Sequence, residues 1–367
     1  MKINNIELEN YRNIEHLRAE FDDINIIWGE NAQGKTNLLE SIFLFTGEKS
    51  FRGNRDSEVI MLGREYAKMK MDFTADGRDQ NAEIIIGNRR TASVNGIKKK
   101  NASSLGEQIK AVIFSPTHLS LIKGGPEERR NFVDTALCQL GGNYRFQLKE
   151  YNKALKQRNT LIKSLDGDLN VPDQMLDYIS LWNSNTARLG AKIIYQRQKY
   201  TQALTPYMDE IFKGISGGSE SIKLQYYSSA GYTPDMDIAE IEKIMLQRMH
   251  MRLTADIVNR TTTTGPHRDD ITITINDMEA RAFASQGQQR SCVLAMKLAE
   301  ASLLKERTGV KPIVLLDDVM SELDRGRQDY ILNHIKDRQI FVTCCDKETI
   351  LQLTQGKTFH IAGGQII

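Results

Sequence analysis

The sequence predicts an α/β fold, in which mixed sheets and helices form a head that a mainly helical lobe interrupts. Alternation of apolar residues in residues 1–30 indicates strands, and residues 66–115 add further strands between Gly-Asn and Asn-Gly turns. From about Glu127 the apolar positions recur at helical spacing as far as Ile211, with a break at Gly167 and Pro172. Strand patterns at both ends and helices between them therefore predict a composite fold.

The last third of the chain returns to the alternating pattern. Strand signals appear near Ile222 and at Ile271–Ile275, a helix is predicted for Ser291–Lys305, and apolar strands follow at 313–317 and 339–343. We therefore expect residues 1–115 and 257–367 to form one head, and residues 116–256 to form the helical lobe, or short arm.

The segment between the first buried strand and the first helix matches the phosphate-loop pattern G-x-x-x-x-G-K-[ST] at every position. Its residues are Gly29, Glu30, Asn31, Ala32, Gln33, Gly34, Lys35 and Thr36. The strand at 25–28 and the helix at 37–45 provide the context that distinguishes this pattern from a chance glycine-rich turn.

Each residue type in this segment suits a nucleotide triphosphate. The two glycines let the backbone turn its N–H groups toward phosphates, helped by the N-terminus of the helix. Lys35 would place a charge on the β- and γ-phosphates, and Thr36 would offer its hydroxyl to Mg²⁺. We therefore expect ATP and Mg²⁺ as cofactors, with Lys35 as a catalytic residue.

A second chemical segment is the apolar strand that ends in Asp317 and Asp318. Asp317 is expected to hold Mg²⁺, and Asp318 to orient or deprotonate the attacking water as the catalytic carboxylate. A pair of acids in an ordinary turn is the alternative explanation, and only the other motifs argue against it.

A third segment resembles the signature loop of ABC-type ATPases and is expected to bind nucleotide through Ser285, Gln286, Gly287 and Gln288. The order phosphate loop, signature loop, acidic strand is that of the ABC and SMC heads. Such a site is complete only when two heads meet, so we expect a homodimer on ATP binding. A long SMC arm is excluded because the helical stretch is too short, and a zinc-hook arm because it has no C-x-x-C.

Composition is compatible with an intracellular protein. Lys and Arg number 49 against 47 Asp and Glu, so the net charge of +2 does not indicate a partner. The four cysteines lack zinc-site spacing, which favours reduced thiols. No signal peptide opens the sequence, and no apolar run approaches ~18 residues. We expect a cytoplasmic protein that does not bind a membrane, and a membrane exporter is possible only if its membrane part is a separate subunit.

Beyond these motifs, the chain resembles the RecF family of bacterial recombination mediators from end to end. The similar segments are Glu9–Asn13, Gly34–Glu40, Ser50–Asp56, Phe114–Pro116, Gly125–Asp134, Thr264–Asp270, Ser285–Arg290 and Leu315–Asp324. The resemblance implies a weak, DNA-stimulated ATPase that acts as a DNA-binding clamp at single-strand gaps and duplex–single-strand junctions. It also implies cooperation with RecO and RecR in loading RecA, in replication restart and in SOS induction, and a nucleotide contact from Arg12.

The sequence departs from other ABC heads at two points. Thr343 and Cys344–Cys345 stand where a switch histidine usually ends a late strand, as is common in RecF-like sequences. No glutamine matches the Q-loop with certainty. The residue that senses the γ-phosphate is therefore unassigned by sequence.

DNA binding rests on basic residues. We expect phosphate contacts from Arg52, Arg55, Arg129 and Arg130, and residues 145–205 hold ten Lys or Arg against five Asp or Glu. A solvated charged surface is the alternative for every one of these groups, and the favoured one for Lys98–Lys100. His267 and Arg268 either serve the dimer or nucleotide, or stabilise a turn.

Two other functions fit part of the sequence. The ATPase subunit of a membrane ABC transporter would share the three motifs, but Gly265–Asp270 argues against it. A P-loop kinase would not need the segment at Ser285. Retention on duplex or gapped DNA that depends on ATP, together with dimerisation, would separate the three.

Overall fold

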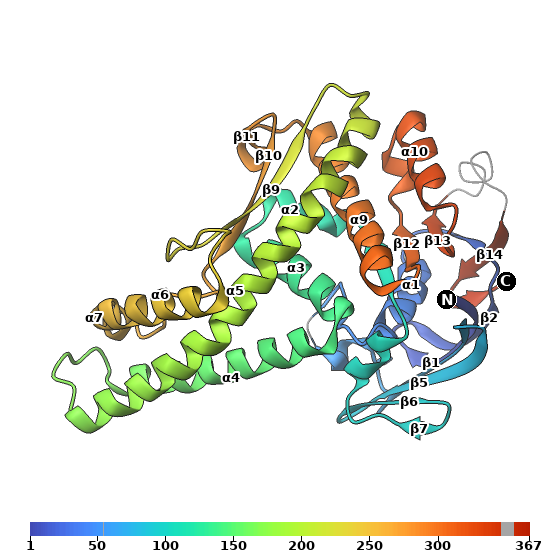
Figure 1. Ribbon diagram of the computed structural model, residues 1–367. Coiled ribbons are helices and arrows are strands. Elements are labelled where there is room, and N and C mark those ends of the chain that lie inside the picture. The colour runs from blue at the N-terminus through green and yellow to red at the C-terminus, as the bar shows by residue number, and fades with distance from the viewer. Residues whose placement is uncertain (54, 346–355) are drawn as a thin grey trace. The chain divides into compact units, whose positions relative to one another are not determined.

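The computed structural model describes residues 1–53, 55–345 and 356–367 (Figure 1). The chain forms two compact units. Unit 1 contains Met1–Leu119, Glu210–Glu220 and Arg290–Ile367, and unit 2 contains Ser120–Asp209 and Ser221–Gln289.

Unit 1 contains an antiparallel sheet with the strand order β2-β1-β4-β5-β6-β7. Its strands are β1 Lys2–Tyr11, β2 Ile14–Glu20, β4 Ala67–Ala75, β5 Arg78–Ile86, β6 Arg90–Val94 and β7 Ile97–Lys98. In β1 and β4 buried apolar residues alternate with more exposed residues, as expected for a sheet with one face on the core.

The second sheet of unit 1 is mainly parallel and has the order β15-β14-β3-β13-β12-β8. Its strands are β3 Ile24–Trp28, β8 Ala111–Phe114, β12 Ile313–Asp317, β13 Ile340–Cys344, β14 Lys357–Ala362 and β15 Gln365–Ile366. Strands β8, β12 and β13 are buried along their whole length, which is usual for parallel strands covered on both faces.

One hydrophobic core joins the two sheets of unit 1. Helix α1, Lys35–Leu44, contributes Leu38, Leu39 and Ile42 to it, beside strand residues such as Leu315 and Phe341. Because α1 begins directly after the phosphate loop, this packing holds the loop at the edge of the parallel sheet. The other helices of unit 1 are α10 Arg325–Ile335 and most of α9 Gln286–Thr308, with short 3₁₀ turns at Asp56–Val59, Ala102–Glu107, Pro116–Leu119 and Met320–Glu322.

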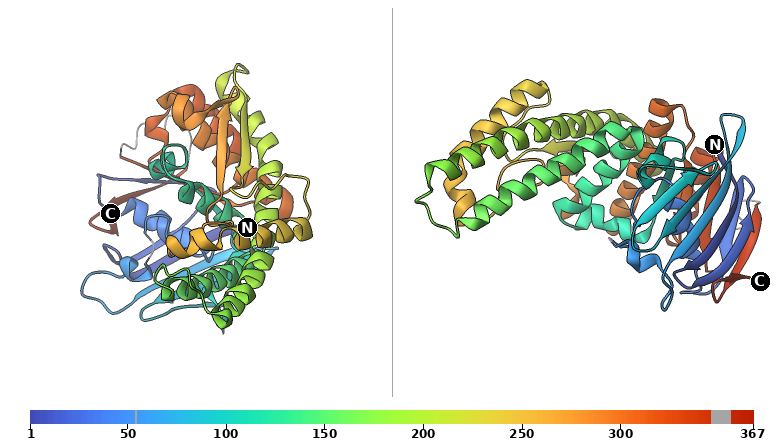
Figure 2. Two further views of the ribbon diagram at one scale, coloured as in Figure 1. Left: turned by 90° about the vertical axis from the view of Figure 1, so that its left-hand side faces the viewer. Right: turned by 90° about the horizontal axis from the view of Figure 1, so that it is seen from below.

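Unit 2 is mainly helical. Its helices are α2 Ser120–Lys123, α3 Pro126–Leu140, α4 Gly142–Ser164, α5 Asp173–Ser216 up to residue 209, α6 Ile238–Met251, α7 Leu253–Val258 and α8 Ala280–Phe283. Helices α4 and α5 run side by side as an antiparallel hairpin (Figure 2), because Gln147 bonds Gln196 and Arg158 bonds Asn183. A small sheet of β9 Ile222–Tyr227, β10 Asp270–Ile275 and β11 Met278–Glu279 completes the unit.

The expected α/β fold with a mainly helical lobe is confirmed, including the helical break between Ser164 and Asp173. The compact units differ in outline from the predicted domains. Residues 257–289 group with unit 2, because β10 pairs with β9. Residues 210–220 group with unit 1, where Gly214 packs against Tyr330 of α10. The predicted domain boundaries themselves stay a prediction. Among the described residues no helix is long and apolar enough to cross a membrane.

Candidate nucleotide site

The carboxyl ends of three parallel strands meet at one edge of the second sheet. In the register of that sheet Asp317 of β12 lies opposite Thr343 of β13, and Cys344 of β13 lies opposite Trp28 of β3. The phosphate loop follows Trp28, and Asp318 follows Asp317. Ligands of open α/β sheets bind in the crevice outside such carboxyl ends. Strand pairing therefore brings together motifs that lie at opposite ends of the sequence.

The phosphate loop needs glycine at two positions. Gly29 has φ 150°, and a Cβ atom there would lie 2.2 Å from the carbonyl oxygen of Ile361. Gly34 has φ 117° and immediately precedes α1, whose N-terminus opens at Lys35. A side chain at Gly29 would push the loop away from β14, and one at Gly34 would strain the backbone. The backbone N–H groups at the helix start are thus free to face an anion.

Lys35 lies within the curve of this loop. Its ammonium donates hydrogen bonds to the carbonyl oxygens of Gly29, at 2.6 Å, and Glu30, at 2.8 Å, and its residue is only 6% exposed. A cation in such a poorly hydrated place interacts strongly with an anion, because little water screens it. Lys35 is therefore positioned to pair with phosphate groups cradled by the loop.

Thr36 and Asp317, the two predicted metal ligands, are in direct contact. The Thr36 hydroxyl donates to Asp317 Oδ1 at 2.8 Å, and the hydroxyl of Thr343 donates to the same oxygen at 2.9 Å. Burial raises the pKa of Asp317, while the two hydroxyl groups partly oppose that shift. A hydroxyl and a carboxylate oxygen in contact are suitable ligands for Mg²⁺.

Asp318 turns away from the strand that precedes it. Its φ of 52° is left-handed, and its N–H donates to the Thr343 hydroxyl at 2.9 Å. The carboxylate accepts a bond of 3.2 Å from the Ser321 hydroxyl and is half-buried. Asp317 and Asp318 therefore have different environments. Thr343, which sequence reasoning left unassigned, holds both residues in place.

The phosphate loop is also held by residues that sequence reasoning did not select. The turn between β14 and β15 donates backbone N–H bonds to Gln33, from Gly363 to its side chain at 2.7 Å and from Gly364 to its carbonyl at 2.9 Å. Asn13 accepts a bond of 2.7 Å from the Asn37 amide at the start of α1. In the sequence, Gly363 and Gly364 indicate a turn, but nothing in the sequence shows that this turn contacts the phosphate loop.

Cys345 lies beside the same loop, one residue beyond β13. Its sulfur is 3.1 Å from Asn31 Oδ1 and 3.9 Å from Lys35 Nζ, and it is the exposed one of the four cysteines. Of the candidates at the switch-histidine position, Thr343 contacts Asp317 and Cys345 contacts the phosphate loop. These two contacts depend on how the strands pair, which the sequence alone does not show.

Arg12, the nucleotide contact implied by the family resemblance, is paired inside unit 1. Its guanidinium donates to both carboxylate oxygens of Glu40, at 2.6 and 2.9 Å, and to the carbonyl of Glu58 at 2.7 Å. Burial of Glu40 favours its neutral form, but hydrogen bonds from Arg12 and Ser50 outweigh this and the pKa of Glu40 is lowered. Arg12 thus anchors α1 from behind the loop, and its contact with nucleotide stays a prediction.

The two predicted DNA-binding arginines of unit 1 have exposed side chains. Arg52 donates to Oδ1 of Asn37 at 2.5 Å, and Asn37 directly follows Thr36 in α1. Arg55 precedes the 3₁₀ turn at Asp56–Val59. Arg52 is also close enough to Asp317 to lower the pKa of that carboxyl group, against the larger effect of burial. The basic loop is therefore linked to the phosphate loop through Asn37. Position 54 of this loop lies outside the described residues.

The predicted signature residues form the start of α9, and Ser285 through Gln289 belong to unit 2. Ser285 Oγ accepts from the N–H of Gln288 at 3.2 Å, and the Gln288 side chain accepts from the N–H of Ser285 at 2.8 Å. This reciprocal pair is a capping box, which leaves the Ser285 hydroxyl hydrogen available as a donor. Ser285 and Gln286 are exposed at this helix start, and Gly287 follows in its first turn.

Arg129 and Arg130, the other predicted DNA contacts, support the segment Thr264–Asp270 within unit 2. Arg129 is 5% exposed, and it donates to both oxygens of Asp270 at 2.8 and 2.9 Å. Arg130 donates to the carbonyl of Asp269 at 2.7 Å, and burial lowers its pKa. Arg129 would have to leave Asp270 to reach a DNA phosphate, so its predicted role stays a prediction without support from these contacts.

His267 has a structural environment in the same segment. Its Nδ1 is 2.6 Å from the Tyr151 hydroxyl and its Nε2 is 3.0 Å from the carbonyl of Thr262. Because a carbonyl can only accept, Nε2 carries the proton and Nδ1 accepts from Tyr151. Burial lowers the pKa of His267 to about 4, so the ring is neutral at pH 7. These contacts suit the alternative in which His267 stabilises a turn.

We expect His267→Gln to flatten the acid side of the pH–stability profile. Between about pH 6.5 and about 4 the unfolded chain binds a proton that folded His267 does not, so the wild type loses stability as pH falls. The measurement is the urea midpoint at a series of pH values, with the exposed His16→Gln as control. The gap between wild type and His267→Gln should narrow on acidification, and a gap that stays constant would contradict a neutral, buried His267.

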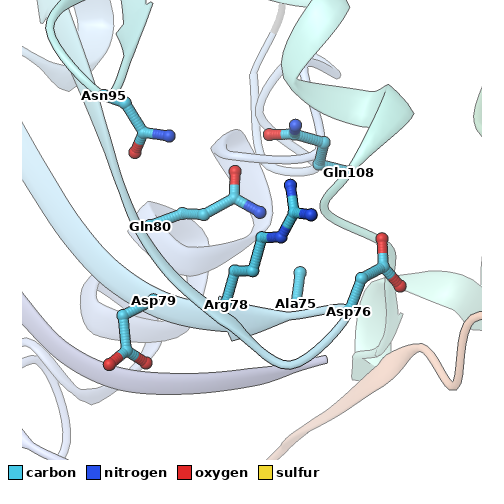
Figure 3. Close-up of a pocket in the computed structure, with 7 residues that line it drawn as sticks. All are labelled: Ala75, Asp76, Arg78, Asp79, Gln80, Asn95 and Gln108. Carbon is cyan, nitrogen blue, oxygen red and sulfur yellow. The ribbon is translucent and has the colours of Figure 1, made fainter.

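A separate polar pocket of about 500 Å³ lies at the turn between β4 and β5. Arg78 points toward Gln108 across it (Figure 3), and Asp76 and Asp79 are also among its lining residues. No residue of the phosphate loop lines this pocket. Its single arginine is balanced by two carboxylates, so it shows no preference for an anion such as a nucleotide.

The phosphate loop and the acidic strand end lie together at the carboxyl edge of a mainly parallel sheet. That sheet shares its core with an antiparallel sheet. This arrangement defines an ATPase head of the ABC and SMC class. The family model described as RecF/RecN/SMC N terminal domain matches residues 2–362. With a solved SMC head domain from Pyrococcus furiosus the chain shares 16% identity and a TM-score of 0.54, which reflects the fold alone.

Closer relatives specify the family. The DNA replication and repair protein RecF of Ruminiclostridium cellulolyticum is 40% identical over 372 residues, covering 100% of this chain and 99% of the relative. That of Bacillus mycoides is 37% identical over 371 residues, covering 100% and 98%. A solved structure of the recombination mediator protein RecF with ATP, from the RecFOR pathway, has a TM-score of 0.92 and 35% identity, covering 100% of this chain and 97% of the other. The chain belongs to the RecF family, and the transporter alternative is not favoured.

Proposed function

We propose that this protein is an ATP-dependent DNA clamp of recombinational repair. Two copies would dimerise on ATP at single-strand gaps and duplex–single-strand junctions, and with RecO and RecR they would assist RecA loading, replication restart and SOS induction. The observation that carries the proposal is the 2.8 Å contact between Thr36 of the phosphate loop and Asp317 of the acidic strand. The RecF relatives over the whole length provide the biological setting.

The residues at the sheet edge fit ATP. Gly29 approaches Ile361 so closely that no side chain fits, which keeps the loop backbone open toward a ligand, and Lys35 supplies a shielded positive charge. Gly29 through Thr36 would cradle the phosphates. Bound ATP supplies the phosphoanhydride bond that water hydrolyses. Lys35 would hold the β- and γ-phosphates, and Asp318 would orient the attacking water or accept its proton.

The same residues fit Mg²⁺ as the partner of ATP. Among the described residues, His, Cys, Asp and Glu side chains form no group of three or more that would hold a metal ion by themselves. This suits Mg²⁺, which is usually bound by one or two protein oxygens together with phosphates and water. Thr36 and Asp317 would supply those protein oxygens.

The signature loop would act in the second copy. Ser285, Gln286, Gly287 and Gln288 present a capped helix start, whose N–H groups and partial positive charge favour an anion. We propose that in the dimer the Ser285 hydroxyl of one copy donates to the γ-phosphate held by Lys35 of the other. ATP then becomes part of the interface, and its hydrolysis releases the clamp.

DNA would contact the head through Arg52 and Arg55. Both are exposed, and the bond from Arg52 to Asn37 connects this basic loop with the helix that carries Thr36. Such arginines bind phosphates without reading bases. DNA on this loop would thereby stimulate hydrolysis, which is otherwise expected to be weak. Arg130 and, if it leaves Asp270, Arg129 remain further proposed contacts.

The proposal is tested by sedimentation and by retention on gapped DNA, each with ATP, ADP or no nucleotide. We expect dimers and retained DNA with ATP only, and monomers with ADP. A protein that binds ATP but remains monomeric on gapped DNA would refute the clamp while leaving the nucleotide site intact.

Asp318→Asn is expected to leave ATP binding unchanged and to reduce hydrolysis by about 10²–10⁴-fold, because the amide cannot accept a proton. Asparagine tolerates the left-handed backbone of this position, with φ 52°, so the loop geometry should persist. The measurement is single-turnover ATP hydrolysis beside nucleotide affinity, with the exposed Asp329→Asn of α10 as control. Unchanged turnover would remove Asp318 from the catalytic role.

A further inference from the structure

Helix α4 has two chemically different sides. Its buried side carries Tyr151, Ala154, Arg158 and Ile162 at helical spacing. The opposite side carries four exposed lysines, to which we refer as the α4 lysine ridge: Lys149, Lys153, Lys156 and Lys163. Steps of four, three and seven residues place these side chains in one row along the helix. At 1.5 Å per residue the row is about 21 Å long.

Within the part of the chain that the structure describes, the charges of the ridge are not compensated. Among the described residues no carboxylate pairs with any of the four ridge lysines, and Glu150 is the one acidic residue in α4. Arg158 on the buried side differs sharply, because it is fully buried and pairs with Asp256 at 2.8 Å. The helix therefore uses one basic residue for its own packing and presents the others to solvent.

Helix α5, which pairs with α4 in the hairpin, adds basic residues near one end of the ridge. The other end of the hairpin is acidic. Because Gln196 of α5 bonds Gln147 of α4, Lys192 and Lys199 of α5 lie near the same end of the hairpin as Lys149. Residues 164–187, at the far end of the hairpin, contain four aspartates and no Lys or Arg. The positive charge is thus confined to a limited stretch of the hairpin.

We propose that the α4 lysine ridge binds the phosphate backbone of a nucleic-acid duplex. A straight row of lysines on a rigid helix matches a rigid row of phosphates, which carries one charge per ~3.4 Å along each strand. Between Lys149 and Lys163 the row contains no aromatic side chain on which a single-stranded base would stack, because its remaining residue is Thr160. The exposed Phe146 lies one turn before Lys149, at the end of the row. The ridge binds the backbone and reads no sequence.

This inference rests on the proposed DNA binding and adds a second contact surface, in unit 2, to Arg52 and Arg55 of unit 1. Beyond Lys163, Asp166 pairs with Arg260 at 2.9 Å, but Asp168, Asp173 and Asp177 would repel phosphates, so the bound segment ends where the ridge ends.

The test compares two triple variants with the same change in charge. One is Lys149→Glu with Lys153→Glu and Lys156→Glu, and its control is Lys98→Glu with Lys99→Glu and Lys100→Glu on the β6–β7 hairpin of unit 1. Affinity for a duplex and for a single strand of equal length is measured with ATP over a series of salt concentrations. Thermal midpoints and ATP affinity verify that both variants fold.

The ridge variant should lose about three phosphate contacts. The slope of log K against log[salt] on duplex should then fall by about 3, which corresponds to a loss of roughly a hundredfold or more near 0.1 M salt. The control should keep most of the wild-type slope, and the single strand should be affected less than the duplex.

Two results would overturn the inference alone: a ridge variant with the salt slope of the control, or equal losses on duplex and single strand. Absence of ATP-dependent DNA binding in the wild type would instead refute the proposed function, and the ridge with it. If the wild type binds DNA with ATP and the ridge variant binds it equally well, the proposed clamp function is retained and only the ridge inference fails.

Discussion

Lys35→Ala is expected to weaken ATP binding by about a hundredfold or more. Residue Lys35 is 6% exposed and its ammonium lies among loop carbonyls, so its charge would act on the phosphates with little screening by water. Losing one partner of such a charge-assisted contact costs about 3 kcal/mol, or roughly two powers of ten in affinity. Titration of ATP by calorimetry measures the effect directly, and ATP-dependent retention on DNA should fall with it.

Truncation of a buried lysine also leaves the carbonyl oxygens of Gly29 and Glu30 without their donor. Lys35→Met keeps most of the side-chain volume and tests the charge with a smaller packing defect. Thermal midpoints show whether either variant unfolds, and Lys98→Ala on an exposed hairpin is the matched control. Folded Lys35 variants with wild-type ATP affinity would mean that this loop is not the nucleotide site.

Ser285→Arg is the second change with a large expected effect, because it places a bulky cation where two copies are proposed to meet around ATP. A single copy is proposed to hold its own nucleotide at Gly29 through Thr36, so ATP binding by the monomer should be nearly unchanged. Dimerisation on ATP, hydrolysis and stable retention on DNA should be lost together. Sedimentation with ATP is the deciding measurement, and normal dimerisation of this variant would refute the two-headed mechanism.

The capping box requires a separate control. Ser285 accepts the N–H of Gln288, so any substitution that removes the hydroxyl also destabilises the start of α9 by about 1 kcal/mol. Ser285→Ala removes the cap without adding bulk or charge, and it should dimerise better than Ser285→Arg. A mixture of Ser285→Arg with Lys35→Ala should form dimers with at most one competent site.

Local sequence was sufficient to predict the helices and strands and to identify the motifs typical of nucleotide binding. The glycines, Lys35 and Thr36 of the phosphate loop lie within eight residues, and the buried strand before them is an apolar run in the sequence. The helix after them was expected to be amphipathic, but α1 is buried on nearly every side because it lies in the core of unit 1. The strand that ends in Asp317 and the helical break between α4 and α5 are equally local. Such features depend on neighbours within a few residues, so their signal survives in a single sequence.

Tertiary structure alone decided which of these residues meet. The bond between Thr36 of α1 and Asp317 of β12, the bond from the Asp318 N–H to the Thr343 hydroxyl of β13, and the contact of Cys345 with Asn31 of the phosphate loop all form where the parallel strands end. Tertiary structure also decided the environment of Arg129, which appeared from sequence to be a surface cation but is buried against Asp270. The reason is physical: the register of parallel strands joins residues that are hundreds of positions apart. A basic residue has the same appearance in sequence whether it pairs with a carboxylate, as Arg129 does, or faces solvent, as Lys149 does.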